Sequence, residues 1–126
     1  MSKDIIETQN APAAVGPYSQ AVKAQGLLYI SGQLPLEPAT GVMVENDMQT
    51  QTRRVLDNLQ QILEAAGSSL EQTLKVTIFL TDMQQFSVVN DIYASYFSSN
   101  PPARACVEVS ALPKGALVEM EAVALC

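Results

Sequence analysis

The sequence predicts one α+β domain spanning residues 1–126, in which two helices cover one face of a mostly antiparallel sheet. The length is typical of a single domain, and 48% of the residues are hydrophobic, which is enough for a core without metals or disulfides. Several segments have the apolar patterning of strands, and two carry apolar side chains at helical spacing. The helices are one-sided, so each should pack on the sheet with a single face.

The first half of the chain reads as three strands and a long helix. The strands are expected near residues 4–7, 19–24 and 27–34, and the helix at about residues 47–66. A loop with two prolines and a glycine separates the first two strands, and a tight turn at Gln25-Gly26 joins the next two. Asn46 or Asp47 can cap the helix, and Gly67 can end it in a left-handed conformation.

The second half adds a strand, a helix and two further strands. The strands are expected at residues 73–80, 104–109 and 117–125, with the helix between the first two of them. Asp82 and Gln85 have the spacing of a capping box, and Asn100-Pro-Pro should stop the helix. A turn at Pro113-Lys-Gly115 predicts that the last two strands pair as a hairpin.

The charge and the missing residue types exclude several classes of function. Thirteen acidic residues against seven basic ones give a net charge of −6, which would repel nucleic acid and anionic membranes. The absence of histidine excludes Ser-His-Asp and Cys-His catalysis and most zinc sites, and neither glycine-rich phosphate-binding motif is present. We therefore expect no metal, no cofactor and no membrane span, and a cytoplasmic protein with two reduced cysteines.

The strand at residues 104–109 carries the residues best suited to chemistry. Alternation places Arg104 and Cys106 on one face, and a hairpin with the last strand would bring Glu119 or Glu121 within reach. The guanidinium offers paired planar donors for a substrate carboxylate, and a glutamate can accept a proton from water. A cross-strand ion pair beside a small buried cysteine explains the same pattern, and the spacing alone favours that structural interpretation.

Two loops hold further candidate residues. Tyr18 follows a rigid Gly-Pro turn, and Ser31-Gly32 ends a strand with a hydroxyl and a flexible residue. Taken singly, each is equally well explained by an ordinary turn or strand end.

Several different short motifs are spread along nearly the whole chain, from about Ile6 to Leu125. They are Asn10-Ala-Pro-Ala-Ala-Val-Gly-Pro-Tyr-Ser-Gln20, Ser31-Gly-Gln-Leu-Pro35, Asn58-Leu with Ala65-Ala-Gly67, Val89-Asn90, Pro102-Ala-Arg-Ala-Cys-Val-Glu-Val109, Leu112-Pro-Lys114 and Glu119-Met-Glu121. In this order and at this spacing they resemble the Rid (YjgF) family of reactive-intermediate deaminases, in its archetypal deaminase branch.

The resemblance implies a fold, an assembly and an activity. The fold would be a chorismate-mutase-like α+β subunit, and the assembly a homotrimer with active sites in the clefts between subunits. The activity would be that of a 2-iminobutanoate/2-iminopropanoate deaminase. Such an enzyme needs no cofactor and hydrolyses 2-imino acids, or 2-enamino tautomers such as 2-aminoacrylate, to 2-oxo acids and ammonia.

The resemblance also implies roles for individual residues. Arg104 resembles the arginine that binds the substrate carboxylate, and Glu119 the glutamate that orients or activates water. Cys106 resembles the pocket cysteine, and Asn90 is a further substrate-binding candidate.

Three more positions match the family's pocket, and two depart from its pattern. Tyr18 resembles a tyrosine that reaches the pocket across the subunit boundary, and Ser31 with Gly32 resembles the pocket wall. Ala105 stands where serine is frequent and Gly115 where aspartate is frequent. Alternation points Ala105 away from the Arg104 face, so this departure leaves the expected activity intact.

Three alternatives remain open at this point. The first is a non-catalytic trimer that binds a small carboxylate, although such a pocket would gain nothing from Glu119. The second is a chorismate mutase, whose dianionic substrate would need several arginines where only Arg104 is well placed. The third, an RNA-cleaving or translation-related role, fits poorly with the net charge of −6 and the lack of histidine.

Overall fold

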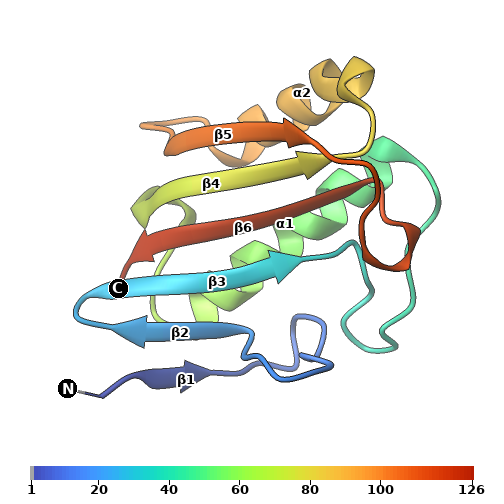
Figure 1. The fold of residues 1–126 in the computed structure, drawn as a ribbon. Helices are drawn as coiled ribbons and strands as arrows, with labels where there is room; N and C mark the ends of the chain where they lie inside the picture. Colours follow the sequence, from blue (N-terminus) through green and yellow to red (C-terminus); the bar gives the residue numbers. More distant parts are fainter. Residues whose placement is uncertain (1) are drawn as a thin grey trace.

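The computed structural model describes residues 2–126 as a six-stranded sheet with two helices packed on one face (Figure 1). The elements follow one another as β1 (Asp4–Ile6), β2 (Ala21–Ala24), β3 (Leu27–Gln33), α1 (Met48–Ala65), β4 (Thr73–Leu80), α2 (Phe86–Tyr96), β5 (Ala103–Glu108) and β6 (Val118–Leu125). The α+β class and the one-sided placement of the helices are confirmed. No helix within residues 2–126 has the length and apolar character that crossing a membrane requires.

The pairing of the last strands differs from the predicted hairpin. The sheet order is β1-β2-β3-β6-β4-β5, so β6 lies between β3 and β4 and runs antiparallel to both. Helix α2 connects β4 to β5 as a crossover, and a crossover returns the chain parallel to the strand it left. The hairpin prediction is therefore wrong, and β4 separates β5 from β6.

Helix α1 begins and ends where the sequence predicts. The Asp47 carboxylate accepts hydrogen bonds from the Thr50 backbone N–H at 2.9 Å and from the Thr50 hydroxyl at 2.7 Å, and these bonds lower the pKa of Asp47. Gly67 follows the helix with a φ of +83°, a conformation that only glycine adopts without strain. Asp82, in contrast, caps the short 3₁₀ turn Met83–Gln85, and α2 itself begins at Phe86.

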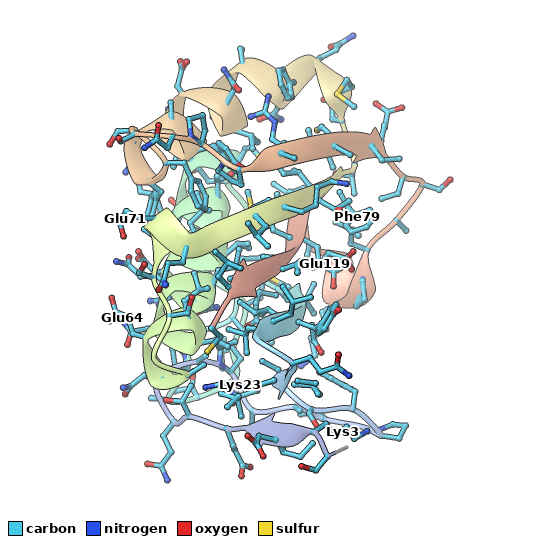
Figure 2. The ribbon with its side chains drawn as sticks, turned by 90° about the vertical axis from the view of Figure 1, so that its left-hand side faces the viewer. Lys3, Lys23, Glu64, Glu71, Phe79 and Glu119 are labelled. Carbon is cyan, nitrogen blue, oxygen red and sulfur yellow. The ribbon has the colours of Figure 1, made fainter. Side chains whose placement is uncertain are left out.

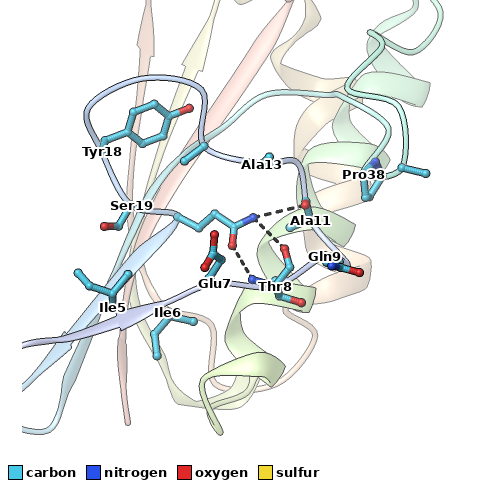
Figure 3. A pocket seen from close by; sticks show the side chains of 13 residues that line it. Ile5, Ile6, Glu7, Thr8, Gln9, Ala11, Ala13, Tyr18, Ser19 and Pro38 are labelled. Atoms are coloured by element: carbon cyan, nitrogen blue, oxygen red, sulfur yellow. Dashed lines mark hydrogen bonds between the residues drawn. The ribbon is translucent and has the colours of Figure 1, made fainter.

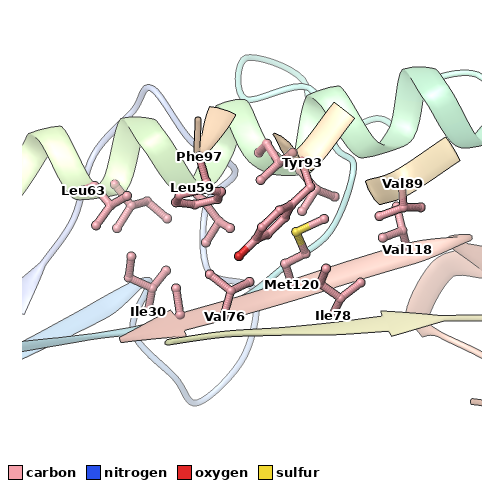
Figure 4. Close-up of a cluster of buried hydrophobic side chains, with 14 of the residues drawn as sticks. Ile30, Leu59, Leu63, Val76, Ile78, Val89, Tyr93, Phe97, Val118 and Met120 are labelled. Carbon is pink, nitrogen blue, oxygen red and sulfur yellow. The ribbon is translucent and has the colours of Figure 1, made fainter. Parts of the chain in front are cut away.

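The core lies between the helices and the sheet (Figure 4). Strands β4 and β6 contribute alternate side chains that are fully or almost fully buried, namely Val76, Ile78, Leu80, Val118, Met120, Ala122 and Ala124. Leu59 and Leu63 of α1 cover them, and Val89, Tyr93 and Phe97 extend the cluster under α2. The alternation fixes which face of each strand is turned toward the helices.

Buried amide side chains hold the loops against this core. Asn58 of α1 donates to the backbone carbonyls of Leu34 and Leu36, both at 3.1 Å, in the segment that follows β3. Gln20 accepts from the Thr8 backbone N–H at 2.7 Å (Figure 3) and also donates to the carbonyl of Pro12 at 2.8 Å. The segment between β1 and β2 therefore has a fixed shape although it lacks regular structure.

The other face of the sheet is not covered by any element within residues 2–126. Three of its apolar residues are about half exposed, with 50% of Tyr29, 44% of Val107 and 46% of Leu125 accessible to solvent. Phe79 of β4 and Glu119 of β6 extend from this face, on the side opposite α1 (Figure 2). We call it the open face.

Candidate active site

The predicted site residues fall into two groups in the structure. Arg104, Cys106 and Asn90 lie together beside α2, and we call them the α2-side group. Tyr18, Ser31, Gly32 and Glu119 lie around the end of β3, and we call them the β3-side group.

In the α2-side group, strand β5 turns Arg104 and Cys106 toward the helices. The parallel register pairs Arg104 with Val76 and Cys106 with Ile78, whose side chains are buried under the helices. Nη1 of Arg104 donates to Oδ1 of Asn90 on α2 at 2.8 Å. The guanidinium also lies over two aromatic rings of α2, with its carbon 5.3 Å from the ring centre of Phe86 and 4.9 Å from that of Tyr93.

Cys106 is half-buried beside this arginine and is not part of a disulfide. Burial raises the pKa of its thiol, and the positive charge of Arg104 offsets only part of that effect. The thiol is therefore protonated at neutral pH. A protonated, partly buried thiol is a poor nucleophile.

In the β3-side group, Glu119 and Gly32 are in direct contact. The β3–β6 register shifts between Ile30 and Gln33, and in this irregular stretch the Glu119 carboxylate lies against Gly32. A Cβ atom at position 32 would collide with that carboxylate, so any larger residue there would displace the Glu119 side chain from its present position. Burial and the neighbouring charge of Glu121 both raise the pKa of Glu119.

Ser31 and Tyr18 complete this group. The Ser31 hydroxyl donates to the Ser19 carbonyl at 2.6 Å, and the Ser31 backbone N–H donates to the Gln20 carbonyl at 2.9 Å. These bonds hold the loop that carries Tyr18 against β3, and Tyr18 and Gly32 line one small surface hollow. About half of Tyr18 is exposed to solvent.

The two groups do not meet within one chain. Glu119 is paired with Phe79 on the open face, whereas Arg104 is on the face that the helices cover. The expectation that Glu119 or Glu121 reaches the Arg104-Cys106 pair through a hairpin is wrong, because β4 lies between β5 and β6. Strand alternation then sends the arginine and the glutamates to opposite faces.

A further hollow of the molecule lies away from most of these residues. It has a volume of about 810 Å³ and lies between the segment at residues 5–20 and the loop at residues 38–39 (Figure 3). Of the predicted site residues it includes only Tyr18. No cluster of three or more Cys, Asp or Glu side chains suited to a metal ion occurs in the described part of the chain.

Sequence reasoning missed Phe86 and Tyr93 as neighbours of Arg104. Their apolar character at helical spacing is that of ordinary core side chains, and Tyr93 is indeed only 4% exposed. Their spacing contained a usable signal, because Phe86, Asn90 and Tyr93 are four and three residues apart and so share one face of a helix.

Comparisons with known proteins give one consistent result. Residues 8–126 match the family described as Endoribonuclease L-PSP. A RutC family protein of Pyrococcus horikoshii is 53% identical over 122 residues, covering 97% of each chain. A 2-iminobutanoate/2-iminopropanoate deaminase of Bos taurus is 48% identical over 123 residues, covering 98% of this chain and 90% of that one.

Solved structures agree with these relatives. The conserved Rid-family protein YyfA of Yersinia pestis, whose function is described as unknown, superimposes with a TM-score of 0.97 at 55% identity, covering 99% of this chain and 100% of that one. The structure of E. coli TdcF with bound serine superimposes with a TM-score of 0.93 at 41% identity, covering 98% of each chain.

Proposed function

Because the chain belongs to the endoribonuclease L-PSP family, which is the Rid (YjgF) family, we propose that it is a deaminase of reactive imines. Its substrates would be 2-imino acids such as 2-iminobutanoate and 2-iminopropanoate, and 2-enamino acids such as 2-aminoacrylate. The products would be 2-oxo acids and ammonia, and no cofactor would take part. The observation that carries this proposal is the Arg104 guanidinium, which has no carboxylate within 4.0 Å among residues 2–126, together with the half-buried Glu119, whose pKa is raised.

The assembly in this proposal is a homotrimer whose sites lie between subunits. Arg104 and Glu119 lie on opposite faces of the sheet, so a site that contains both must take them from two chains. The open face supplies an apolar surface for such an association, since Tyr29, Val107 and Leu125 are half exposed. Tyr18 would then extend from one subunit toward Arg104 of its neighbour.

The proposed chemistry uses only these side chains and water. Arg104 holds the substrate carboxylate through paired N–H donors, which places the protonated imine carbon in a fixed position. The Glu119 carboxylate accepts a proton from water as the water oxygen bonds to that carbon, giving a carbinolamine. The proton is then passed to the amino nitrogen, the C–N bond breaks, and the hydroxyl loses its proton to leave a 2-oxo acid and ammonia.

Cys106 would shape the pocket without forming a bond to the substrate. Its raised pKa keeps the thiol protonated, and no histidine is available to activate it. Both cysteines are free, which is consistent with a reducing compartment such as the cytoplasm, where we place the protein in this proposal.

A trimer that binds small carboxylates without turnover is the second candidate, and the structure gives reason to rank it lower. An anionic Glu119 near the carboxylate of a ligand would weaken binding, so its position is explained by catalysis and not by affinity. Cleavage of RNA, which the family description suggests, is opposed by the net charge of −6.

The proposal is tested by generating the substrate in place. A serine dehydratase releases 2-aminoacrylate from serine, and the pyruvate formed by its spontaneous hydrolysis is followed through lactate dehydrogenase. We expect added protein to accelerate pyruvate release in proportion to its concentration, and Glu119→Gln at equal concentration to accelerate it far less. If the purified protein leaves the rate at the spontaneous value, the deaminase proposal is overturned.

A further inference from the structure

We propose that α2 holds the Arg104 guanidinium through uncharged groups only, so that its positive charge remains available for the carboxylate of a ligand. In this arrangement Phe86, Asn90 and Tyr93 are positioning residues that act through Arg104. The inference rests on the proposed function, because it concerns the residue that would bind the substrate carboxylate. It also changes the role of Asn90, from a ligand of the substrate to a support for the arginine.

The geometry of α2 brings three different contacts to one guanidinium. Phe86, Asn90 and Tyr93 follow one another at helical spacing and so share one face of α2. This face lies beside Arg104 of β5. Asn90 accepts one hydrogen bond from Nη1 at 2.8 Å. The two rings lie 5.3 and 4.9 Å from the guanidinium carbon, within the range of cation–π attraction.

None of these contacts neutralises the arginine. Within residues 2–126 the only ion pair at 4.0 Å or less joins Arg54 to Glu37, so no carboxylate is that close to Arg104. Burial raises the pKa of Tyr93 to about 12, and its phenol therefore stays uncharged at neutral pH. The exposed guanidinium of Arg104 therefore keeps its positive charge, which favours an anionic ligand.

The support is rigid because it is tied to the core. Tyr93 is 4% exposed and its ring centre is 4.6 Å from that of Phe97, and Phe86 packs against the same hydrophobic cluster. Arg104 itself is exposed. The contacts with α2 therefore restrict the Arg104 side chain when the chain folds. Because less conformational entropy is then lost when the ligand binds, binding is stronger. The other N–H groups of the guanidinium stay free for a planar carboxylate.

A carboxylate at position 90 is the most informative change. In Asn90→Asp the new carboxylate would occupy the place of Oδ1 and form an ion pair with Arg104 inside the chain. A merely structural Asn90 would lose nothing through this substitution, since the hydrogen bond to Nη1 is kept. The carboxylate of a ligand, in contrast, would bind more weakly, because the guanidinium charge would already be neutralised and the new Asp carboxylate would repel it.

The experiment measures binding and turnover separately. Pyruvate serves as the carboxylate probe and is titrated by NMR against wild-type protein, Asn90→Asp, and Gln49→Glu, which adds the same charge on an exposed position of α1. We expect Asn90→Asp to keep or raise the melting temperature while the pyruvate Kd rises by about tenfold or more. Gln49→Glu should leave the Kd unchanged. In the deaminase assay, KM should rise more than kcat falls.

The aromatic support is tested in the same assays. Phe86→Leu should weaken pyruvate binding several-fold, and Phe86→Tyr, which restores a ring, should recover most of it. Wild-type affinity in Asn90→Asp, or a wild-type protein that binds no pyruvate, would overturn the inference. Binding that follows the expected order without any deamination would instead refute the proposed function alone.

Discussion

Mixing two inactive variants tests whether one site takes Arg104 and Glu119 from different chains. In the structure the two side chains lie on opposite faces of one sheet, with β4 between their strands. Arg104→Ala and Glu119→Gln should each remove nearly all deaminase activity in pure oligomers. We expect activity to return when the two variants, distinguishable in mass by different tags, are co-expressed in equal amounts and all of their oligomers are purified together.

The size of the recovery follows from the arrangement. An intact site needs Arg104 from a Glu119→Gln chain and Glu119 from an adjacent Arg104→Ala chain. With equal amounts and random assembly, each condition is met half of the time, so about one quarter of the sites are intact in any closed ring. If both residues came from the same chain, no site would be intact and the activity would stay at the level of the separate variants.

A mixture of wild type with the double variant is the matched control. Sites shared between chains should again give about one quarter of the wild-type activity, whereas sites within one chain would give about one half. Melting temperatures of both single variants and a mass measurement of the mixed species show that folding and assembly are intact. Verified mixed oligomers without recovered activity would refute the assignment of Arg104 and Glu119 to different chains.

Four further outcomes are expected. Arg104→Lys should lose on the order of a hundredfold in kcat/KM, because an ammonium lacks paired planar donors; near-wild-type activity would show that the carboxylate anchor is elsewhere. Cys106→Ala should keep a substantial fraction of turnover while Glu119→Gln loses about a hundredfold, and the reverse ranking would indicate covalent catalysis. Glu121→Gln removes a neighbouring negative charge that raises the pKa of Glu119, so the acidic limb of the kcat/KM profile should move to lower pH; an unmoved or oppositely shifted limb would contradict this assignment. Asn58→Leu leaves two loop carbonyls without their donor and should lower the free energy of unfolding by about 1–3 kcal/mol in urea titrations, whereas wild-type stability would show that these bonds contribute little.

The elements of the fold were predictable because they are local. Apolar spacing placed both helices and all six strands to within a few residues, and the Gln25-Gly26 turn has the positive φ values, 53° and 80°, that such a turn requires. Pairing was less predictable because it depends on distant residues. Gly115 suits a hairpin, yet Pro113–Gly115 forms a 3₁₀ turn in a connection that passes the end of β4 before β6 begins.

The site was predictable in its residue types and not in its arrangement. Alternation correctly placed Arg104 and Cys106 on one face, because that face is determined within one strand. The position of Glu119 relative to them depends on whether β5 and β6 are neighbours in the sheet. No local sequence pattern indicates that β4 lies between them. The two rings beside Arg104 were missed because a buried aromatic residue that supports a charge has the same helical spacing as one that only fills the core.

The central place of β6 also determines how the domain can be completed during synthesis. β6 is the last strand in chain order, yet β3 and β4 are joined into one sheet only through it. Until residues 118–125 have left the ribosome, both strands present an unpaired edge, and such edges are where nascent chains associate wrongly. The closing register joins residues as distant as Leu28 and Ala124, which makes this step slow relative to helix formation. A pause in translation before β6 would therefore prolong the interval in which a chaperone has to shield both edges.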